Sequence, residues 1–307
     1  MLLERFLIAL LAIAGPVHAL AQAAPLPPAT QNPSPMVEET RTHERLMSCD
    51  LGGARRSFAG PLGKLVEVWI PDGARRDSFD LVIHYLGAAW LAEQAVARLS
   101  VPTVAAVVNI GRGSGIYDRT FSDPAVFDSM LVGITREVRA ATGGDPQLRH
   151  LTLSGFSAGH GAIRAILRDA RHAARVEAIL LLDGMHTSYV PEHSLLASGA
   201  TLDTSNLVEF AAFARAASRG EKRFVVTHSE IFPGTFASTT ETADWLLHAL
   251  GLRRTAVLRW GPHGMQQLSW VRSGGFQLLG FAGNSAPDHI DHLHAMPEML
   301  VPLGAAH

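Results

Sequence analysis

One short segment constrains the fold more than any other part of the chain. An apolar run at 151–153 leads into Gly155-Phe-Ser157-Ala-Gly159, and a helical pattern rich in Ala, Ile, Leu and Arg follows at about 162–175. A serine at the tip of a sharp strand-to-helix turn sits on strained backbone that pushes its hydroxyl outward. The flanking glycines are needed because a side chain there would collide with a neighbouring strand or helix. The pattern predicts that Ser157 is a nucleophile.

Apolar runs that indicate strands alternate with helical patterns along the rest of the chain. This alternation predicts a mostly parallel central sheet with helices on both faces. Two runs, 55–59 and 64–70, flank a Gly-Pro-Leu-Gly turn and predict an antiparallel hairpin at the N-terminal edge of the sheet. The remaining expected strands cover 79–85, 103–110, 151–153, 176–182, 223–227, 255–260 and 276–281, the last two as a candidate pair. The expected helices cover 90–99, 124–141, 162–175, 206–218, 241–250 and 288–301, the last kinked or split at Pro297.

The elbow around Ser157 and the order of these elements resemble the α/β-hydrolase superfamily, from about residue 57 to the C-terminus. The resemblance implies an α/β-hydrolase fold and a serine hydrolase that cleaves a carboxylic ester, or an amide, through an acyl-enzyme. It implies a small-molecule substrate and no cofactor. It also implies that the acid and then the histidine of a catalytic triad follow the serine along the chain.

Two carboxylates compete for the role of the triad acid. Asp183 ends the apolar run at 176–182, and a carboxylate at the carboxyl end of a parallel strand points into the site crevice. Glu230 follows the next strand, where the family more often carries its acid. We favour Asp183, because its strand is the cleaner one, and retain Glu230 as the alternative.

The base must be chosen among fifteen histidines. His289 follows the last expected strand and opens the final helix, which is where the resemblance places the catalytic histidine. His292, one helical turn further on, and His263, before the last strand, are the alternatives.

The oxyanion donors also follow from the resemblance. It implies oxyanion donors at Ala158, directly after the nucleophile, and at Ala88, in the loop after the strand at 79–85. From the sequence itself, Arg112, Ser114 and Tyr117 lie in and after the glycine-rich loop that follows the strand at 103–110. We expect them to face the crevice, with Arg112 and Tyr117 binding substrate and Arg112 suiting an anionic group on it.

The C-terminal sequence also allows an alternative, a metal site. On a helix, Asp288, Asp291 and His292 share one face, which suits zinc or a similar ion in a metal-dependent hydrolase. No H-E-x-x-H signature supports this alternative. A third interpretation is a catalytically inactive α/β-hydrolase-fold binding protein, although serine, acid and histidine candidates all remain in the expected order.

The N-terminal segment, the net charge and the cysteine count indicate where the protein is located and which partners it has. Residues 1–23 resemble a cleavable signal peptide, whose apolar run is too short to span a bilayer, so we expect a periplasmic or secreted protein without a stable membrane anchor. A net charge of −2 gives no indication of nucleic-acid binding. The single cysteine, Cys49, excludes an internal disulfide.

The rest of the chain divides into a linker and one domain. A Pro-rich linker with a short N-terminal segment covers 24–50, with a short helix expected at 38–47, and the hydrolase domain covers 51–307. Within it, 185–222 is a candidate cap over the site, since caps set specificity in this fold. Its apolar side chains, from Leu196 to Phe210, either line an acyl pocket or belong to a helix packed on the sheet.

Overall fold

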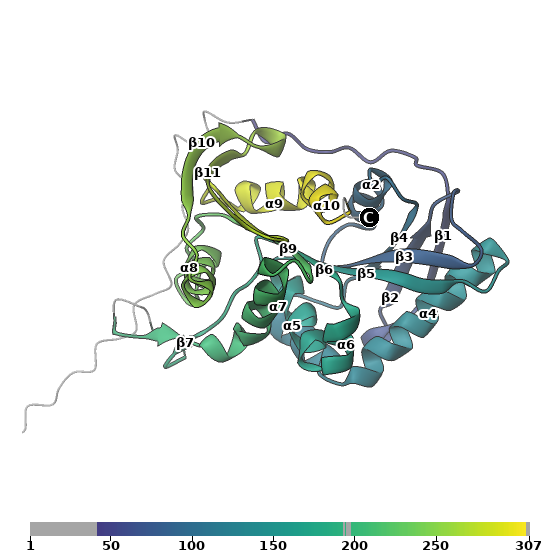
Figure 1. Cartoon of the computed structure of the whole chain (residues 1–307), viewed down its shortest axis with the longest axis horizontal. Coiled ribbons are helices and arrows are strands. Elements are labelled where there is room, and N and C mark those ends of the chain that lie inside the picture. The colour runs from purple at the N-terminus through teal and green to yellow at the C-terminus, as the bar shows by residue number, and fades with distance from the viewer. Residues whose placement is uncertain (1–41, 193, 195–197, 305–307) are drawn as a thin grey trace, which may run out of the picture.

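The computed structural model describes residues 42–192, 194 and 198–304. The expected signal peptide at 1–23 and the part of the linker before residue 42 lie outside the described residues. The described chain folds around a 10-stranded sheet, whose helices and strands are labelled in Figure 1.

The sheet has the strand order β1-β2-β4-β3-β5-β6-β9-β12-β11-β10. Neighbouring strands from β4 to β12 are parallel, β1 and β2 form an antiparallel hairpin at one edge, and β11 and β10 add antiparallel strands at the other. These pairings confirm the predicted mostly parallel sheet with its N-terminal antiparallel hairpin. The strands are β1 (Ala54–Ala59), β2 (Leu65–Ile70), β3 (Ser78–Tyr85), β4 (Thr103–Val108), β5 (Gln147–Phe156), β6 (Ala178–Leu182), β9 (Arg223–His228), β10 (Thr255–Trp260), β11 (Gln266–Ser273) and β12 (Phe276–Phe281).

Helices cover both faces of the sheet, as predicted. Helices α2, α9 and α10 lie on the upper face in Figure 1, and α4, α5, α6 and α7 lie below it. Each face has its own apolar core, because side chains of the parallel strands point alternately to the two faces. The helices are α2 (Ala89–Ala97), α3 (Ser114–Phe121), α4 (Pro124–Thr142), α5 (His160–Arg168), α6 (Ala170–Arg175), α7 (Val208–Ser218), α8 (Thr239–Leu250), α9 (Ala286–His294) and α10 (Met296–Gly304).

Several elements differ from their predictions. The expected pairing of 255–260 with 276–281 is wrong, because β11 lies between β10 and β12 and pairs with both. The expected helix at 162–175 is broken at Asp169, whose side chain caps α6 instead. Residues 114–121, expected as loop after the glycine-rich turn, form α3. The final helix is split, as expected, although the break falls at Ala295 rather than at Pro297.

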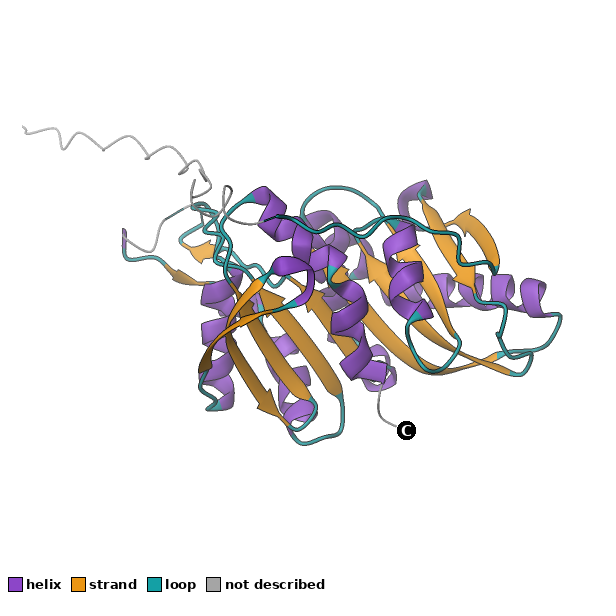
Figure 2. Ribbon diagram, turned by 90° about the horizontal axis from the view of Figure 1, so that it is seen from above, coloured by secondary structure: helices purple, strands orange, loops and turns teal. Residues whose placement is uncertain are grey.

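The segment that enters the domain is a strap rather than a helix. Residues 42–47 contain no regular secondary structure, so the helix expected there is wrong within the described part of it. The strap contacts the upper helices: the backbone N–H of Leu46 donates to His294 Nδ1 at 3.0 Å, and Gln94 donates to the carbonyl of Met47 at 2.8 Å. Figure 1 and Figure 2 show this strap passing over the upper helices on its way to β1.

The strand order fixes where a site can form. Strand β3 has β4 on one side and β5 on the other, so the chain changes direction across the sheet between these strands. Crevices of open α/β sheets form outside the carboxyl ends of the strands at such a switch point. Strand β5 ends there with Phe156, directly before Ser157. Among the described helices, none combines the length and apolar composition needed to cross a membrane.

Candidate active site

Ser157 stands on a strained turn between β5 and α5. Its φ of 48° lies in the left-handed region, which a residue with a side chain rarely adopts. The turn packs tightly against the ends of the neighbouring strands. A Cβ on Gly159 would lie 2.2 Å from the carbonyl oxygen of Tyr85, and a Cβ on Gly184 would lie 2.4 Å from that of Ser157. Glycine at 159 is therefore required sterically, as expected from the sequence.

Asp183 and His289 form a hydrogen-bonded pair beside this turn. The Nδ1 of His289, on the first turns of α9, donates to Oδ2 of Asp183 at 2.7 Å, a charge-assisted bond across the sheet edge. Asp183 follows β6 and also has a positive φ, 41°. Its carboxylate accepts three further bonds, from the backbone N–H and the hydroxyl of Ser229 and from the hydroxyl of Thr239.

The environment keeps Asp183 ionised although it is buried. Burial alone would raise the pKa of this carboxyl, but the neighbouring His292 and His289 and the Thr239 hydroxyl hold the pKa well below its ordinary value. The carboxylate therefore faces His289 as a fixed negative charge. Such a group orients an imidazole and stabilises its protonated form.

Two cavities meet at Ser157. The first, of about 330 Å³, is lined by Asp183, His289 and the apolar side chains of Ile231 and Pro233. The second, of about 570 Å³, is lined by Ala158, His160, Arg164 and the first residues of α3. Ser157, His186 and Phe236 line both. Ser157 and His289 thus open onto a shared space, although no hydrogen bond joins Ser157 Oγ to His289 Nε2 among the described residues.

Two further histidines line this space and differ from His289 in their partners. His160 Nδ1 donates to the carbonyl oxygen of Ser157 at 2.8 Å, and His186 Nδ1 donates to that of Ala237 at 3.1 Å. Burial, followed by the proximity of His186, lowers the pKa of His160 to about 3. Burial also lowers the pKa of His186, although the charge of Asp183 opposes this shift. Both imidazoles are therefore neutral near pH 7.

The alternative acid and bases lie elsewhere. Glu230 is exposed, and it lines neither cavity. His292 is buried, and its Nδ1 bonds to the hydroxyl of Thr227 at 2.7 Å. His263 lies 3.4 Å from a carboxylate oxygen of Glu298. Of the residues proposed for the triad, the geometry brings Asp183, His289 and Ser157 together.

The two expected oxyanion donors differ in placement. Ala158 lines the larger cavity beside Ser157. In the loop after β3, the N–H groups of Leu86 and Gly87 are engaged by the carbonyl of Val108 and the side chain of Asn109. The next N–H, that of Ala88, makes no hydrogen bond within the described residues and precedes α2 as its N-cap. Ala88 lines neither cavity, so its role stays a prediction.

Neither Arg112 nor Tyr117 lines the cavities at Ser157. Tyr117 is 0 % exposed and packs its ring edge-on against Tyr85, so the expectation that it faces the crevice is wrong. Residue 117 lies within α3, which turns this side chain into the core. Arg112 is exposed and lines neither cavity. Ser114, also expected at the crevice, does line the larger cavity, together with Gly115.

Of the three metal ligands expected in the C-terminal helix, Asp288 and Asp291 lie close together, whereas His292 does not join them. Asp288 caps the N-terminus of α9, accepting from the N–H groups of Asn284 and Ser285, and His292 points at Thr227. Asp291 pairs with His43 and Arg45 of the strap. In the described residues, the two carboxylates that could share an ion are those of Asp288 and Asp291. The third ligand would be His43 rather than His292. The guanidinium of Arg45 already compensates the charge of Asp291.

The candidate cap divides into two parts. The first part of this segment lines the larger cavity, through His186, Thr187, Ser188 and Glu192. Its end is α7, where Phe210 is buried and stacks near Phe224 of the sheet. The apolar residues expected from 202 to 210 thus include a helix packed on the sheet, while Leu196 lies outside the described residues.

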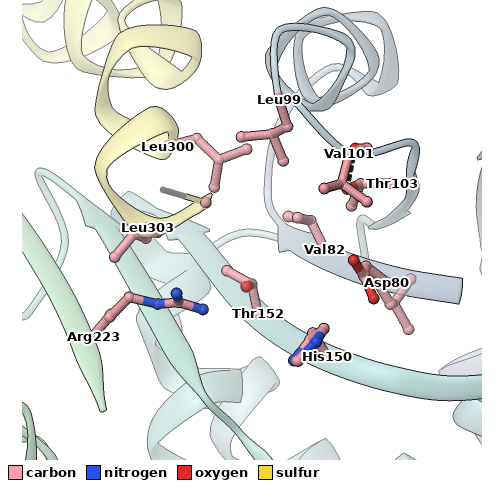
Figure 3. Close-up of a pocket in the computed structure, with 12 residues that line it drawn as sticks. Asp80, Val82, Leu99, Val101, Thr103, His150, Thr152, Arg223, Leu300 and Leu303 are labelled. Atoms are coloured by element: carbon pink, nitrogen blue, oxygen red, sulfur yellow. Dashed lines mark hydrogen bonds between the residues drawn. The ribbon is translucent and has the colours of Figure 1, made fainter. Parts of the chain in front are cut away.

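A third cavity lies at the opposite ends of the parallel strands. It measures about 40 Å³ and is lined by Asp80, Thr103, His150 and Arg223 near the beginnings of β3, β4, β5 and β9, with Leu300 and Leu303 of α10 above them (Figure 3). It contains no serine or cysteine nucleophile among its lining residues. The cavity of about 330 Å³, by contrast, brings Ser157 together with Asp183 and His289.

Sequence reasoning missed Thr239, Ser229, His186 and Arg164. The hydroxyls of Thr239 and Ser229 donate to the carboxylate of Asp183, which lies 56 and 46 positions away in the sequence, so no local pattern indicates them. Arg164 carried a usable signal: it follows His160 by four positions on α5, and such residues share a helix face.

No family model and no curated protein matches this sequence. Solved structures with similar architecture include a variant of esterase rPPE, with a TM-score of 0.44 and 16% identity over 84% of this chain and 84% of that one. Esterase 2 of Thermogutta terrifontis, phosphorylated by paraoxon, has a TM-score of 0.44 and 16% identity over 83% of this chain and 96% of its own. A thermostable esterase from Pseudomonas putida has a TM-score of 0.42 and 16% identity, covering 83% of this chain and 84% of its own.

Proposed function

We propose that this protein is a serine hydrolase that cleaves a carboxylic ester, or an amide, of a small-molecule substrate. The observation that carries the proposal is the 2.7 Å bond between His289 and Asp183 at a cavity that Ser157 also lines. The strained backbone of Ser157 adds support, because strain of this kind is maintained where the hydroxyl must be exposed.

In the proposed mechanism, Ser157 Oγ attacks the substrate carbonyl carbon and its proton passes to His289 Nε2. The N–H groups of Ala158 and Ala88 stabilise the resulting oxyanion, and removing one such donor typically costs about 2.7–4 kcal/mol of transition-state stabilisation. The tetrahedral intermediate collapses as His289 gives its proton to the leaving alcohol or amine. Water then attacks the acyl-enzyme, His289 accepts its proton and returns it to Ser157 Oγ, and the acid is released.

The direct test is hydrolysis of p-nitrophenyl acetate and butyrate by the purified mature protein. We expect turnover that Ser157→Ala reduces by roughly 10⁴-fold or more, while Ser122→Ala, an exposed serine outside the cavities, has no effect. Chelator treatment should leave the rate unchanged. Retained turnover in folded Ser157→Ala would overturn the proposal, and loss of turnover on chelation would favour a metal-dependent hydrolase.

We also propose that the protein is exported after cleavage of 1–23. The support is the sequence pattern: a short apolar run followed by small residues at Ala19, Ala21 and Ala23. Intact mass of the protein recovered from the periplasm or medium of a bacterial host is the measurement. A mass beginning after Ala21 or Ala23 is expected, and an uncleaved chain kept in the cytoplasm would refute export.

A further inference from the structure

The two cavities at Ser157 differ in chemistry, and the proposed mechanism assigns a half of the substrate to each. His289 lines the smaller cavity and not the larger one. A general acid must lie within hydrogen-bond reach of the leaving atom. The leaving alcohol therefore occupies the smaller cavity, beside Ile231, Pro233 and Ala286, and the acyl chain extends into the larger one.

The larger cavity contains a buried cation. Arg164 is 7 % exposed and lines this cavity, and its Nε donates to Oδ2 of Asp118 at 2.7 Å. Its two Nη groups have no hydrogen-bond partner among the described residues. Asp118 thus fixes the guanidinium through Nε and leaves the fork of Nη1 and Nη2 without a described partner, on a residue that lines the cavity. Such a fork matches the two oxygens of a carboxylate.

The other groups that face the cavity define the charge it accepts. Ser114 and Gly115 begin α3, whose N-cap Gly113 supplies no side-chain bond, so the unpaired N–H groups of the first turn favour an anion. His160 and His186 are neutral, and Glu192 is an exposed carboxylate on the wall. Among the described residues that line the cavity, Arg164 is the one cation, and with Asp118 behind it a monoanion is favoured over a dianion such as phosphate.

Resting on the proposed function, we infer that the acyl half of the substrate ends in a carboxylate bound by Arg164, so that the enzyme hydrolyses half-esters of dicarboxylic acids. Arg164 follows Ser157 by seven positions, about 10 Å along a helix at 1.5 Å per residue, and its side chain leans back toward the N-terminus. The gap between the acylated serine and the guanidinium suits a short aliphatic chain.

The test compares charged and neutral esters of matched shape. Hydrolysis of monomethyl succinate, glutarate and adipate is followed by pH-stat beside that of methyl butanoate, pentanoate and hexanoate. We expect the ratio of kcat/KM for the best half-ester to that of its neutral counterpart to be about 10- to 100-fold, the usual strength of a charge-assisted hydrogen bond. In Arg164→Gln this ratio should fall below one, since the anion then meets only Asp118 and Glu192.

Arg168 supplies the matched control. It donates to the other oxygen of Asp118 at 2.9 Å but lines neither cavity at Ser157. Arg168→Gln removes the same charge from the same carboxylate, and its ratio should equal that of the wild type. Arg164→Lys, which keeps the charge and loses the fork, should give an intermediate ratio. A wild-type ratio of one or less, or equal ratios in Arg164→Gln and Arg168→Gln, would overturn the inference.

Labelling with a fluorophosphonate separates this inference from the proposed function. Labelling of Ser157 together with turnover of neutral esters, at a ratio of one or less, refutes the carboxylate subsite alone. Absence of both labelling and turnover with every ester refutes the serine mechanism, and the subsite with it. The rate of labelling in Arg164→Gln also reports whether that variant is folded.

Discussion

The three histidines around Ser157 differ in the hydrogen-bond partner of Nδ1, and this partner decides their chemistry. His289 donates its Nδ1 proton to a carboxylate, whereas His160 and His186 donate theirs to backbone carbonyls. An ionised carboxylate stabilises the imidazolium that forms when a base takes a proton, and a carbonyl in a buried site does so far less. Proximity to the nucleophile is shared by all three, so the partner of Nδ1, rather than position, identifies the base.

The largest effect is expected when the imidazoles of His289 and His186 are removed in turn, which tests which of them is the base. His289→Asn should lower kcat by roughly 10⁴-fold or more, because no other group near Ser157 can accept and return its proton. His186→Asn should lower it by less than about tenfold, as expected for a residue that only lines the cavity. Steady-state rates with p-nitrophenyl butyrate measure both. Comparable losses in the two variants would mean that the Nδ1 partner does not select the base.

The next test changes the partner and keeps the imidazole. In Asp183→Asn an amide replaces the carboxylate, so His289 loses the charge that stabilises its protonated form and the partner that fixes its tautomer. We expect kcat to fall by roughly 10³- to 10⁴-fold. Glu230→Gln, at the alternative acid, serves as the control and should retain the wild-type rate. The reverse outcome would transfer the role of the acid to Glu230.

A smaller effect is expected from the groups that hold Asp183. Thr239→Ala removes the hydroxyl that donates to Oδ1 of Asp183 at 2.7 Å. The carboxylate then loses part of its orientation and of the stabilisation of its charge, and we expect kcat to fall about tenfold. Thr240→Ala is the matched control, since that hydroxyl donates to the carbonyl of Ser229 at 2.7 Å and not to a carboxylate.

The last effect is on stability rather than on the rate, and it concerns buried histidines that have no carboxylate partner. Burial lowers the pKa of His84 to about 4. Below the ordinary value of about 6.5 the unfolded chain binds a proton at this position that the folded chain does not, so the free energy of unfolding falls as the pH drops from about 6.5 to 4. The loss for this residue is on the order of 3 kcal/mol at most.

Urea unfolding at pH 7 and pH 4.5 measures this pH dependence. His84→Asn should lose less stability between the two values than the wild type does, whatever its stability at pH 7. His248, which is exposed, gives the control, and His248→Gln should follow the wild-type curve. An unchanged difference in His84→Asn would show that His84 does not contribute.

Local patterns predicted the parts of the molecule that are local in the chain. The strand, glycine and helix around Ser157 lie within one short segment, and the ends of β6 and β12 could be read from apolar runs next to Asp183 and His289. Strand β11 was missed because two of its three buried positions, Gln267 and Ser269, are polar, so the alternating burial gives no apolar alternation in the sequence. The expected pairing of its neighbours failed for that reason.

Contacts between distant segments could not be predicted from such patterns. The burial of Tyr117 depends on α3 packing against the core, and the free fork of Arg164 depends on Asp118, 46 positions away. The carboxylate of Asp183 is likewise held by Ser229 and Thr239, whose sequence neighbourhood indicates only a loop and a helix start. The sequence thus predicted the candidate nucleophile and its order with acid and base, but not the surroundings that distinguish one histidine from another.

The central claim is that Ser157 is activated by His289 and by no other histidine. Its most direct measurement is the time course of fluorophosphonate labelling, read by intact mass, in the wild type, Ser157→Ala, His289→Asn and His186→Asn. The account predicts a single adduct on the wild type and on His186→Asn at similar rates, none on Ser157→Ala, and labelling of His289→Asn slowed by orders of magnitude. An adduct on Ser157→Ala, or undiminished labelling of His289→Asn, would contradict it.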